Sequence, residues 1–323
     1  MTHLGSAPSW MARIEPGDVL GALYDTHHAT LASPSPSAVT DTYAALVEGL
    51  TNLRESLSAP AWRKAVAATR GHPTRKLLME DPFTRRCYQK PRGRPDDAVM
   101  LDFAYRHGSV RPMVRRASGV GQRVHRAATA SRYAEAIRHR REILAEHIDA
   151  ALTESATRIL GMGVGHLREA SSVDFETADL DLFIAADADA RTQPVVRATA
   201  RHPRIRHQQL SARDVLDNRL TESAFHLIYA TGMFDQLDDT SGRALTRRLA
   251  SHLAPGGQLL ISGTLPTCAD RAFAEAVLDV HRVYRNEGDL VRMVHTAWRG
   301  GLAVARCWRG GAGQLVYVLA ERM

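Results

Sequence analysis

The sequence has few of the residues that mark a secreted, metal-binding or membrane-spanning chain. Its 323 residues include only three cysteines, Cys87, Cys268 and Cys307, which lie far apart and match no zinc-ligand spacing. No apolar run approaches the roughly 18 residues that cross a bilayer. The first residues lack the basic start and apolar block of a secretion signal. We therefore expect a cytoplasmic protein with reduced thiols, no metal site and no membrane partner.

Lysine and aromatic residues are scarce as well. Only three lysines occur, and aromatic residues make up 6% of the chain, so stacking platforms for single-stranded RNA are poor. The charge is nevertheless uneven. Residues 61–150 carry 20 Lys and Arg against 9 Asp and Glu, or +11, whereas the rest carries 22 against 26, or −4. The basic segment is suited to nucleic acid, to an anionic small molecule or merely to solvent.

The first half of the chain shows no convincing strand pattern. Residues 1–40 are rich in Pro, Ser, Thr and Ala, which is typical of a loose arm. From there to residue 152, apolar residues recur at steps of three and four. Residues 131–152 indicate one long helix in which Arg138 to Arg141 face water. We predict an all-helical domain over residues 41–152 that serves as a substrate-binding or lid domain.

The second half alternates between strand and helix patterns, which indicates a mostly parallel sheet. A short glycine-rich loop, Trp308 to Gly313, predicts a hairpin with an antiparallel terminal strand. The fold class is therefore α/β, with a Rossmann-like seven-stranded sheet over residues 153–323. Strands are predicted at Thr157–Leu160, Asp181–Ala186, Ile205–Leu210, Phe225–Tyr229, Gly257–Ser262, Leu302–Cys307 and Gln314–Leu319. Helices are predicted at His166–Ala170, Asp189–Thr199, Ser241–Leu253, Ala269–Tyr284 and Glu287–His295.

The first of these strands runs into three alternate glycines, Gly161, Gly163 and Gly165, and the second ends on Asp187. Such a turn lets the backbone approach a nucleoside cofactor, while the acid can accept hydrogen bonds from ribose hydroxyls. The dinucleotide fingerprint requires its third glycine where His166 stands. The pattern therefore favours S-adenosylmethionine (SAM) over a nicotinamide cofactor. A glycine-rich surface turn, with Asp187 as a helix cap, is the alternative.

Two further stretches resemble class I SAM-dependent methyltransferases. Phe225-His-Leu-Ile-Tyr-Ala-Thr-Gly-Met-Phe-Asp-Gln-Leu-Asp-Asp239 and Leu253-Ala-Pro-Gly-Gly-Gln-Leu-Leu-Ile261 are similar to their fourth and fifth strands. Within that class, the segment from Glu80 to Tyr105 and the segment from His281 to Glu287 resemble the extracellular-factor (3-hydroxypalmitic acid methyl ester) biosynthesis proteins. The resemblance covers residues 40–320 and implies a helical region ahead of a methyltransferase sheet.

The chain departs from that family at two places. The family reads Gly-Tyr-x-Gly-Asp where this chain has Gly93-Arg-Pro-Asp-Asp97. The acid that precedes the first motif glycine in the family is Leu160 here. The second departure removes one usual contact near the methionine end of SAM.

The motifs, their positions after the strands and the resemblance together predict a set of site residues; for each of them a structural role, as a turn, helix cap, core or surface residue, is the alternative. For the cofactor these are Gly161, Gly163, Gly165, Asp187, Arg213, Asp214, Thr231 and Gly232. As catalytic residues we expect His281, Tyr105 and Asp102. For substrate binding we expect Lys90, Arg92, Asp97, Tyr284 and Arg285.

The sequence thus predicts a methyltransferase that uses SAM, releases S-adenosylhomocysteine (SAH), and methylates a small molecule. The acceptor would be a carboxylate, amine or hydroxyl of a metabolite, with secondary metabolism as one setting. An RNA methyltransferase and a non-catalytic SAM- or SAH-binding module are the alternatives. No nucleic-acid partner is expected, and a homodimer is left open.

Overall fold

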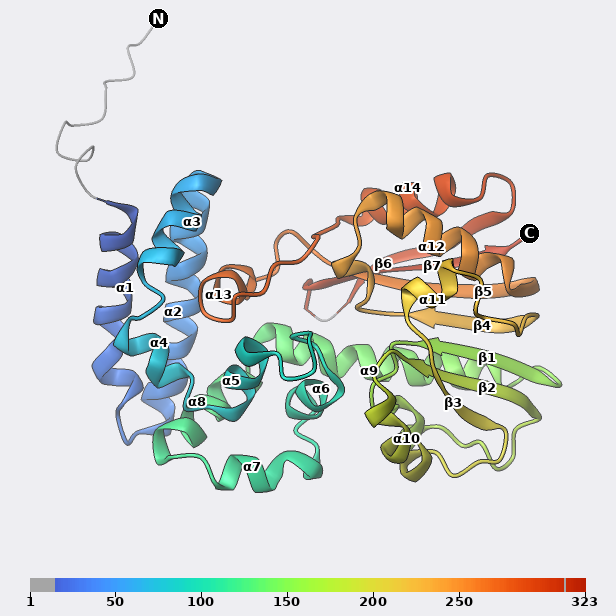
Figure 1. Ribbon diagram of the computed structural model, residues 1–323, viewed down its shortest axis with the longest axis horizontal. Helices are drawn as coiled ribbons and strands as arrows, with labels where there is room; N and C mark the ends of the chain where they lie inside the picture. Colours follow the sequence, from blue (N-terminus) through green and yellow to red (C-terminus); the bar gives the residue numbers. More distant parts are fainter. Residues whose placement is uncertain (1–14, 311) are drawn as a thin grey trace, which may run out of the picture. The chain divides into compact units, whose positions relative to one another are not determined.

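The computed structural model describes residues 15–310 and 312–323, which fall into two compact units (Figure 1). We call them the helical unit and the sheet unit. The helical unit takes the described residues 15–89, together with 111–131 and 269–280. The sheet unit takes residues 90–110, 132–268 and 281–323. The predicted boundary at residue 152 is therefore not where the units divide, because two later segments return to the helical unit and an early one joins the sheet.

The helical unit is built from short amphipathic helices around one apolar core. Serines at the N-caps of α2, α3 and α8 accept backbone N–H bonds of the first turn, and prolines begin several helices. The core includes Leu20, Tyr24, Leu46 and Leu50. The helices are α1 (Pro16–Leu31), α2 (Pro36–Ser56), α3 (Ala59–Ala68), α4 (Pro73–Leu78), α5 (Pro82–Gln89), α7 (Arg111–Arg115), α8 (Gly119–Thr129) and α13 (Arg271–Ala276).

The predicted loose arm over residues 1–40 is wrong where the structure describes it. Helix α1 begins at Pro16 and α2 at Pro36, and the apolar residues Leu20, Tyr24 and Leu31 of α1 are fully buried. The composition of this stretch suggested a loose arm because it contains few apolar residues. The spacing of Leu20, Tyr24 and Leu31 nevertheless places them together on one buried face of α1. Residues 1–14 of the predicted arm lie outside the described residues.

Helix α13 is much shorter than the predicted helix Ala269–Tyr284. Arg75 donates from Nε and Nη2 to the carbonyl oxygen of Val277, at 3.2 Å and 2.9 Å. This carbonyl oxygen therefore receives its hydrogen bonds from a side chain and not from the backbone of a longer helix. Asp279 then has a left-handed backbone with φ of 53°. A side chain of α4 thus ends the helix, a contact that no local pattern reveals.

The sheet unit contains a seven-stranded sheet in the order β3-β2-β1-β4-β5-β7-β6. Neighbouring strands from β3 to β5 are parallel, whereas β7 is antiparallel to both β5 and β6. This confirms the predicted fold class, including the terminal hairpin. The strands are β1 (Thr157–Met162), β2 (Leu180–Asp187), β3 (Ile205–Gln209), β4 (Phe225–Ala230), β5 (Leu253–Thr264), β6 (Leu302–Gly310) and β7 (Leu315–Arg322).

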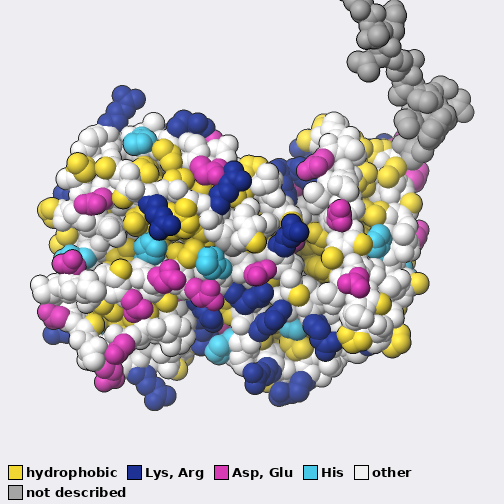
Figure 2. Space-filling model, turned by 180° about the vertical axis from the view of Figure 1, so that it is seen from behind, with side chains coloured by type: hydrophobic (Ala, Val, Ile, Leu, Met, Phe, Trp, Pro, Cys, Tyr) yellow, Lys and Arg dark blue, Asp and Glu magenta, His cyan; other side chains and the backbone are white. Residues whose placement is uncertain are grey.

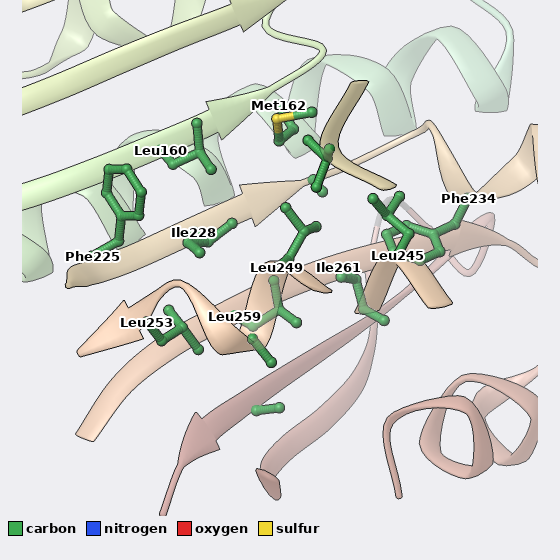
Figure 3. Packing of buried hydrophobic residues seen from close by; sticks show 14 of the residues in the cluster. Leu160, Met162, Phe225, Ile228, Phe234, Leu245, Leu249, Leu253, Leu259 and Ile261 are labelled. Atoms are coloured by element: carbon green, nitrogen blue, oxygen red, sulfur yellow. The ribbon is translucent and has the colours of Figure 1, made fainter. Parts of the chain in front are cut away.

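One face of the sheet packs against helices through a large apolar cluster (Figure 3). Leu160, Ile228 and Ile261 contribute from three neighbouring strands, and Leu245 and Leu249 contribute from α12. Helix α9 packs against β1 and β4 and contributes no residue to that cluster. The helices of this unit are α6 (Ala98–Ala104), α9 (Arg132–Ala151), α10 (Gln193–Thr199), α11 (Ala212–Leu216), α12 (Asp239–Ser251) and α14 (Glu287–Ala297).

The predicted helix directly after β1, His166–Ala170, is wrong. Leu167 has a left-handed backbone with φ of 52°, and only the short 3-10 helix η3 (Arg168–Ser172) follows. The other 3-10 helices are η2 (Gly108–Val110), η4 (Ala190–Thr192) and η5 (Phe234–Gln236). Within the described ranges, no helix combines the length and apolar character needed to cross a membrane.

Candidate functional site

A cavity of about 320 Å³ opens at the carboxyl ends of β1 to β4. We call it the strand-end cavity. Gly163 lines it after β1, Ala188 after β2, Ser211 after β3, and Thr231 and Gly232 after β4. All its lining residues belong to the sheet unit. In doubly wound sheets, ligands bind at this edge where the strand order reverses, here between β1 and β4.

The three motif glycines have three different roles. A Cβ on Gly161 would overlap the phenol of Tyr229, so this glycine is needed for packing. Gly163 and Gly165 have left-handed backbones, with φ of 70° and 57°. Gly163 is the one of the three that lines the cavity, and a Cβ there would meet nothing closer than the Met233 Cε at 3.7 Å. The turn therefore leaves open space where a ligand can approach the backbone.

Asp187 is fully buried and does not line the cavity. Its Oδ1 accepts from the Asp189 N–H at 2.9 Å, and its Oδ2 from the Gly165 N–H at 2.9 Å. Arg94 donates to both oxygens from Nη2, at 3.0 Å and 3.2 Å. Because a carboxylate offers about four lone-pair sites, all of them are occupied. Ribose hydroxyls would reach Asp187 only if Arg94 moved aside.

The segment that carries Arg94 also places Asp96 in the cavity wall. Gln236 donates from Nε2 to the Asp96 Oδ2 at 2.7 Å. The Asp96 Oδ1 is buried and has no hydrogen-bond partner in the described structure. Arg94 and Asp96 are the two residues at which the Gly93–Asp97 segment departs from the family pattern, and both line the cavity.

Helix α9 and the segments after β4 and β5 supply the rest of the wall. Tyr133, Ile137 and Arg140 follow each other at steps of four and three, so they share one face of α9. Arg140 is only 7% exposed, which makes the prediction that it faces water wrong. Arg282 lies over the Tyr133 ring, with its Cζ 5.0 Å from the ring centroid.

Asp235 contributes a buried carboxyl group to this wall. Thr264 donates to it twice, from the backbone N–H at 2.8 Å and from Oγ1 at 2.6 Å. Burial raises the pKa of Asp235 despite these bonds and the nearby guanidinium groups of Arg282 and Arg140.

The expected catalytic residues do not line the cavity. Asp102 is buried and accepts hydrogen bonds from Arg168 at 2.8 Å and from Ser109 at 2.8 Å, and it bonds His166 at 2.9 Å. Tyr105 is partly buried and close to Arg140, and burial raises its pKa. His281 is exposed outside the cavity, whereas the next residue along the chain lines it. The placement of Asp102 indicates a structural role.

The expected substrate residues are also placed outside the cavity. Arg285 is 2% exposed and donates to the carbonyl oxygens of Phe234 at 2.7 Å and Leu237 at 2.6 Å, so it braces this turn. Arg92 pairs with Asp189 at 3.0 Å. Two further residues of the set, Lys90 and Tyr284, are absent from the lining as well.

Asp97 completes the expected substrate set. It caps α6 by accepting from the backbone N–H groups of Val99 and Met100, at 3.0 Å and 2.9 Å. Like Arg285, it is engaged within the fold and does not line the cavity.

Among the expected cofactor residues after β3 and β4, Thr231, Gly232 and Arg213 line the cavity. Arg213 is exposed and pairs with Asp217 at 3.1 Å. Asp214 instead forms a capping box with Ser211 at the start of α11.

Most residues that line the cavity were not predicted from the sequence. The α9 residues could have been found, because their spacing places Arg140 on the apolar face of the predicted helix. The others depend on how segments distant in the chain meet. The missed residues are Arg94, Asp96, Met100, Leu101, Tyr133, Ile137, Arg140, Ala188, Leu210, Ser211, Ala212, Met233, Asp235, Gln236, Leu237 and Arg282.

The strand order, with β7 antiparallel between β5 and β6, is the SAM-methyltransferase variant of the doubly wound sheet. The fold is a methyltransferase-like α/β fold. The cavity also fits SAM chemically. Gly163 leaves room beside its backbone, and the unpaired Asp96 Oδ1 can accept a hydrogen bond from a cationic group. The feature that fits SAM least well is Asp187, because its carboxylate oxygens already accept hydrogen bonds from Arg94.

No protein-family model matches the sequence, and no curated protein does either. Among solved structures, the chain is similar to a possible exported protein from Bordetella parapertussis, with a TM-score of 0.58 and 14% identity over 98% of this chain and 99% of that chain. This likeness shows a shared fold over both chains.

Two further structures match the chain in part. The N-methyltransferase NodS from Bradyrhizobium japonicum WM9, solved with SAH, has a TM-score of 0.44 and 15% identity over 57% of this chain and 87% of that chain. The magnesium protoporphyrin IX methyltransferase from Synechocystis PCC 6803 has a TM-score of 0.45 and 11% identity over 59% of this chain and 84% of that chain. These two scores are too low to support an argument about cofactor or substrate.

Proposed function

We propose that the protein is a SAM-dependent methyltransferase that binds SAM in the strand-end cavity and methylates a small molecule. The observation that carries the proposal is the cavity at the switch point between β1 and β4, with the open backbone of Gly163 on its wall. The donor methyl of SAM is already activated, so the protein contributes mainly by holding donor and acceptor in line.

The acceptor would lie against Tyr133, Asp235 and Arg282, which line the same cavity. The guanidinium of Arg282 favours an acceptor that carries a carboxylate or another hydrogen-bond acceptor. An amine or hydroxyl acceptor must also lose a proton. Asp235 is the cavity carboxyl whose pKa burial shifts towards neutrality, which suits a proton acceptor.

Calorimetry with SAM, SAH and NAD tests the cofactor. We expect SAM and SAH to bind with micromolar affinity and NAD to give no heat of binding. Heat with NAD and none with SAH would contradict the proposal. Tight SAH binding without turnover on any acceptor would instead support a non-catalytic SAH-binding module.

An RNA methyltransferase is the second candidate, because residues 61–150 carry a charge of +11. Figure 2 shows many Lys and Arg side chains on the face it presents, interspersed with Asp and Glu side chains. A gel shift with tRNA and rRNA at increasing salt tests this candidate, since affinity for phosphates falls steeply with salt. Light scattering in solution tests the homodimer.

A further inference from the structure

The end of β1 offers no carboxylate to a bound cofactor. Leu160 precedes Gly161 at the position where the family has an acid, and its side chain is fully buried in the apolar cluster of the sheet. SAM carries an ammonium and a carboxylate at its methionine end. If SAM occupies the strand-end cavity, other residues must bind both groups.

Asp96 is the unpaired anion of the cavity wall. Its Oδ2 is used by Gln236, whereas its Oδ1 is buried without a donor. A buried carboxylate oxygen without a hydrogen bond is costly, so a donor from a ligand would stabilise it. The positive charge of Arg94 also interacts with the carboxylate of Asp96, but the Arg94 Nη2 donates its hydrogen bonds to Asp187.

Arg140 is the matching cation. It is almost fully buried and lines the cavity, and in the described part of the chain no ion pair joins it to a carboxylate. The groups that act on its charge are the phenols of Tyr105, Tyr133 and Tyr317 and the carboxyl group of Asp235, which is held by Thr264. A Cβ on Gly232 would lie 2.7 Å from the Arg140 Nη1, so the guanidinium reaches the segment after β4.

We propose that Asp96 and Arg140 bind the methionine end of SAM, with Asp96 accepting from the α-ammonium and Arg140 donating to the α-carboxylate. The inference rests on the proposed function. Leu160 supplies no acidic side chain for the methionine end of SAM. Under this inference, one residue of segment 93–97 and one residue of α9 bind that end instead. A carboxylate and a guanidinium that line one cavity, and that no ion pair joins to another side chain among the described residues, match a zwitterion, which carries one charge of each sign.

Calorimetry with three ligands tests each residue by itself. SAH has both α groups, 5′-methylthioadenosine has neither, and decarboxylated SAM lacks only the carboxylate. We expect Asp96→Asn to weaken SAH about 10- to 100-fold, the range of one charge-assisted hydrogen bond, and to leave 5′-methylthioadenosine within about twofold. Arg140→Met should weaken SAM by a similar factor and leave decarboxylated SAM unchanged.

Asp238→Asn is the matched control, because this exposed carboxylate belongs to the same unit and caps α12 outside the cavity. Thermal melting of each variant checks that it is folded. Equal losses of SAH and 5′-methylthioadenosine in Asp96→Asn, or no loss of either, overturn the inference while leaving the proposed function intact. Failure of the unaltered protein to bind SAH or 5′-methylthioadenosine overturns the proposed function itself.

Discussion

At the scale of single residues, the pair Arg94–Asp187 decides how a nucleoside can enter the site. Arg94 takes up the carboxylate positions that a ribose diol would use, and the other donors to Asp187 among the described residues are the backbone N–H groups of Gly165 and Asp189. The ligand-free site is thus satisfied internally. Cofactor binding through Asp187 would exchange one set of charged hydrogen bonds for another.

We expect Arg94→Ala to lower the free energy of unfolding of the ligand-free protein by about 1–3 kcal/mol. It should also enlarge the thermal shift that SAH produces, because ribose hydroxyls then find free acceptor sites on Asp187. Arg92→Ala, which removes the neighbouring pair with Asp189, is the control. A smaller SAH shift in Arg94→Ala than in Arg92→Ala would show that Arg94 itself contacts the ligand.

The carboxylate of Asp102 is the clearest source of pH dependence. Burial would raise its pKa, but hydrogen bonds from Arg168, His166 and Ser109 outweigh burial and hold the pKa well below its usual range. A depressed carboxyl pKa stabilises the folded state above the unfolded-state value of about 3.9 and ceases to do so as the pH falls below it.

Asp102→Asn should therefore cost about 3–5 kcal/mol at pH 7, because the Arg168 guanidinium loses its buried partner. The difference in the free energy of unfolding between Asp102→Asn and the unaltered protein should shrink below a pH of about 4. Urea unfolding across this range measures it. A difference that stays constant with pH would mean that packing, and not charge, is responsible.

At the scale of elements, the turn after β1 combines a packing requirement with a binding surface. Gly163→Ala adds a methyl group to the cavity wall without a clash, so the protein should still fold, with a backbone strain of about 1 kcal/mol. Because the methyl group takes up space beside the backbone where the ligand approaches, the affinity for SAH should fall at least about tenfold. Gly256→Ala has a similar φ of 74° and open space. It should show the same strain with unchanged SAH affinity in calorimetry. Equal SAH affinity in both variants would place the ligand away from this turn.

The sequence predicted the elements of the sheet far better than it predicted the wall of the cavity. All seven strands are found near their predicted positions, and those at the centre of the sheet are apolar runs bounded by turn residues, whereas the edge strand β3 has the polar sequence Ile-Arg-His-Gln-Gln. Predictions from local sequence patterns were wrong where contacts with residues distant in the chain determine the structure. The side chain of Arg75 ends α13, and the buried environment of Arg140 depends on the packing of α9 against the sheet. Gly163, Thr231 and Gly232 were predictable, since they follow strands whose order was predictable.

At the scale of the whole molecule, the chain passes between the two units five times. Helix α13 belongs to the helical unit through contacts such as Trp62 Nε1 to Glu275 at 2.8 Å and Arg54 Nε to Glu275 at 2.7 Å. Its Phe273 is buried in the core of that unit. The helical unit is therefore not a separable N-terminal domain.

Deletion of residues 1–89 should expose Val124 of α8 together with Phe273 and Val277, and the truncated protein should aggregate. The same deletion with Phe273→Ser and Val277→Ser should aggregate less. Size-exclusion chromatography with light scattering measures the difference. A monomeric, folded product from the simple deletion would show that these side chains find other cover.

The interleaved path also sets an order of events during synthesis. The first five helices leave the ribosome long before residue 280, the last residue of their unit. At about 5–20 residues per second, the delay is roughly 10–40 s. During this time the apolar surface that Phe273 covers beside Tyr43 stays exposed, and we expect chaperones to bind it until α13 has been translated.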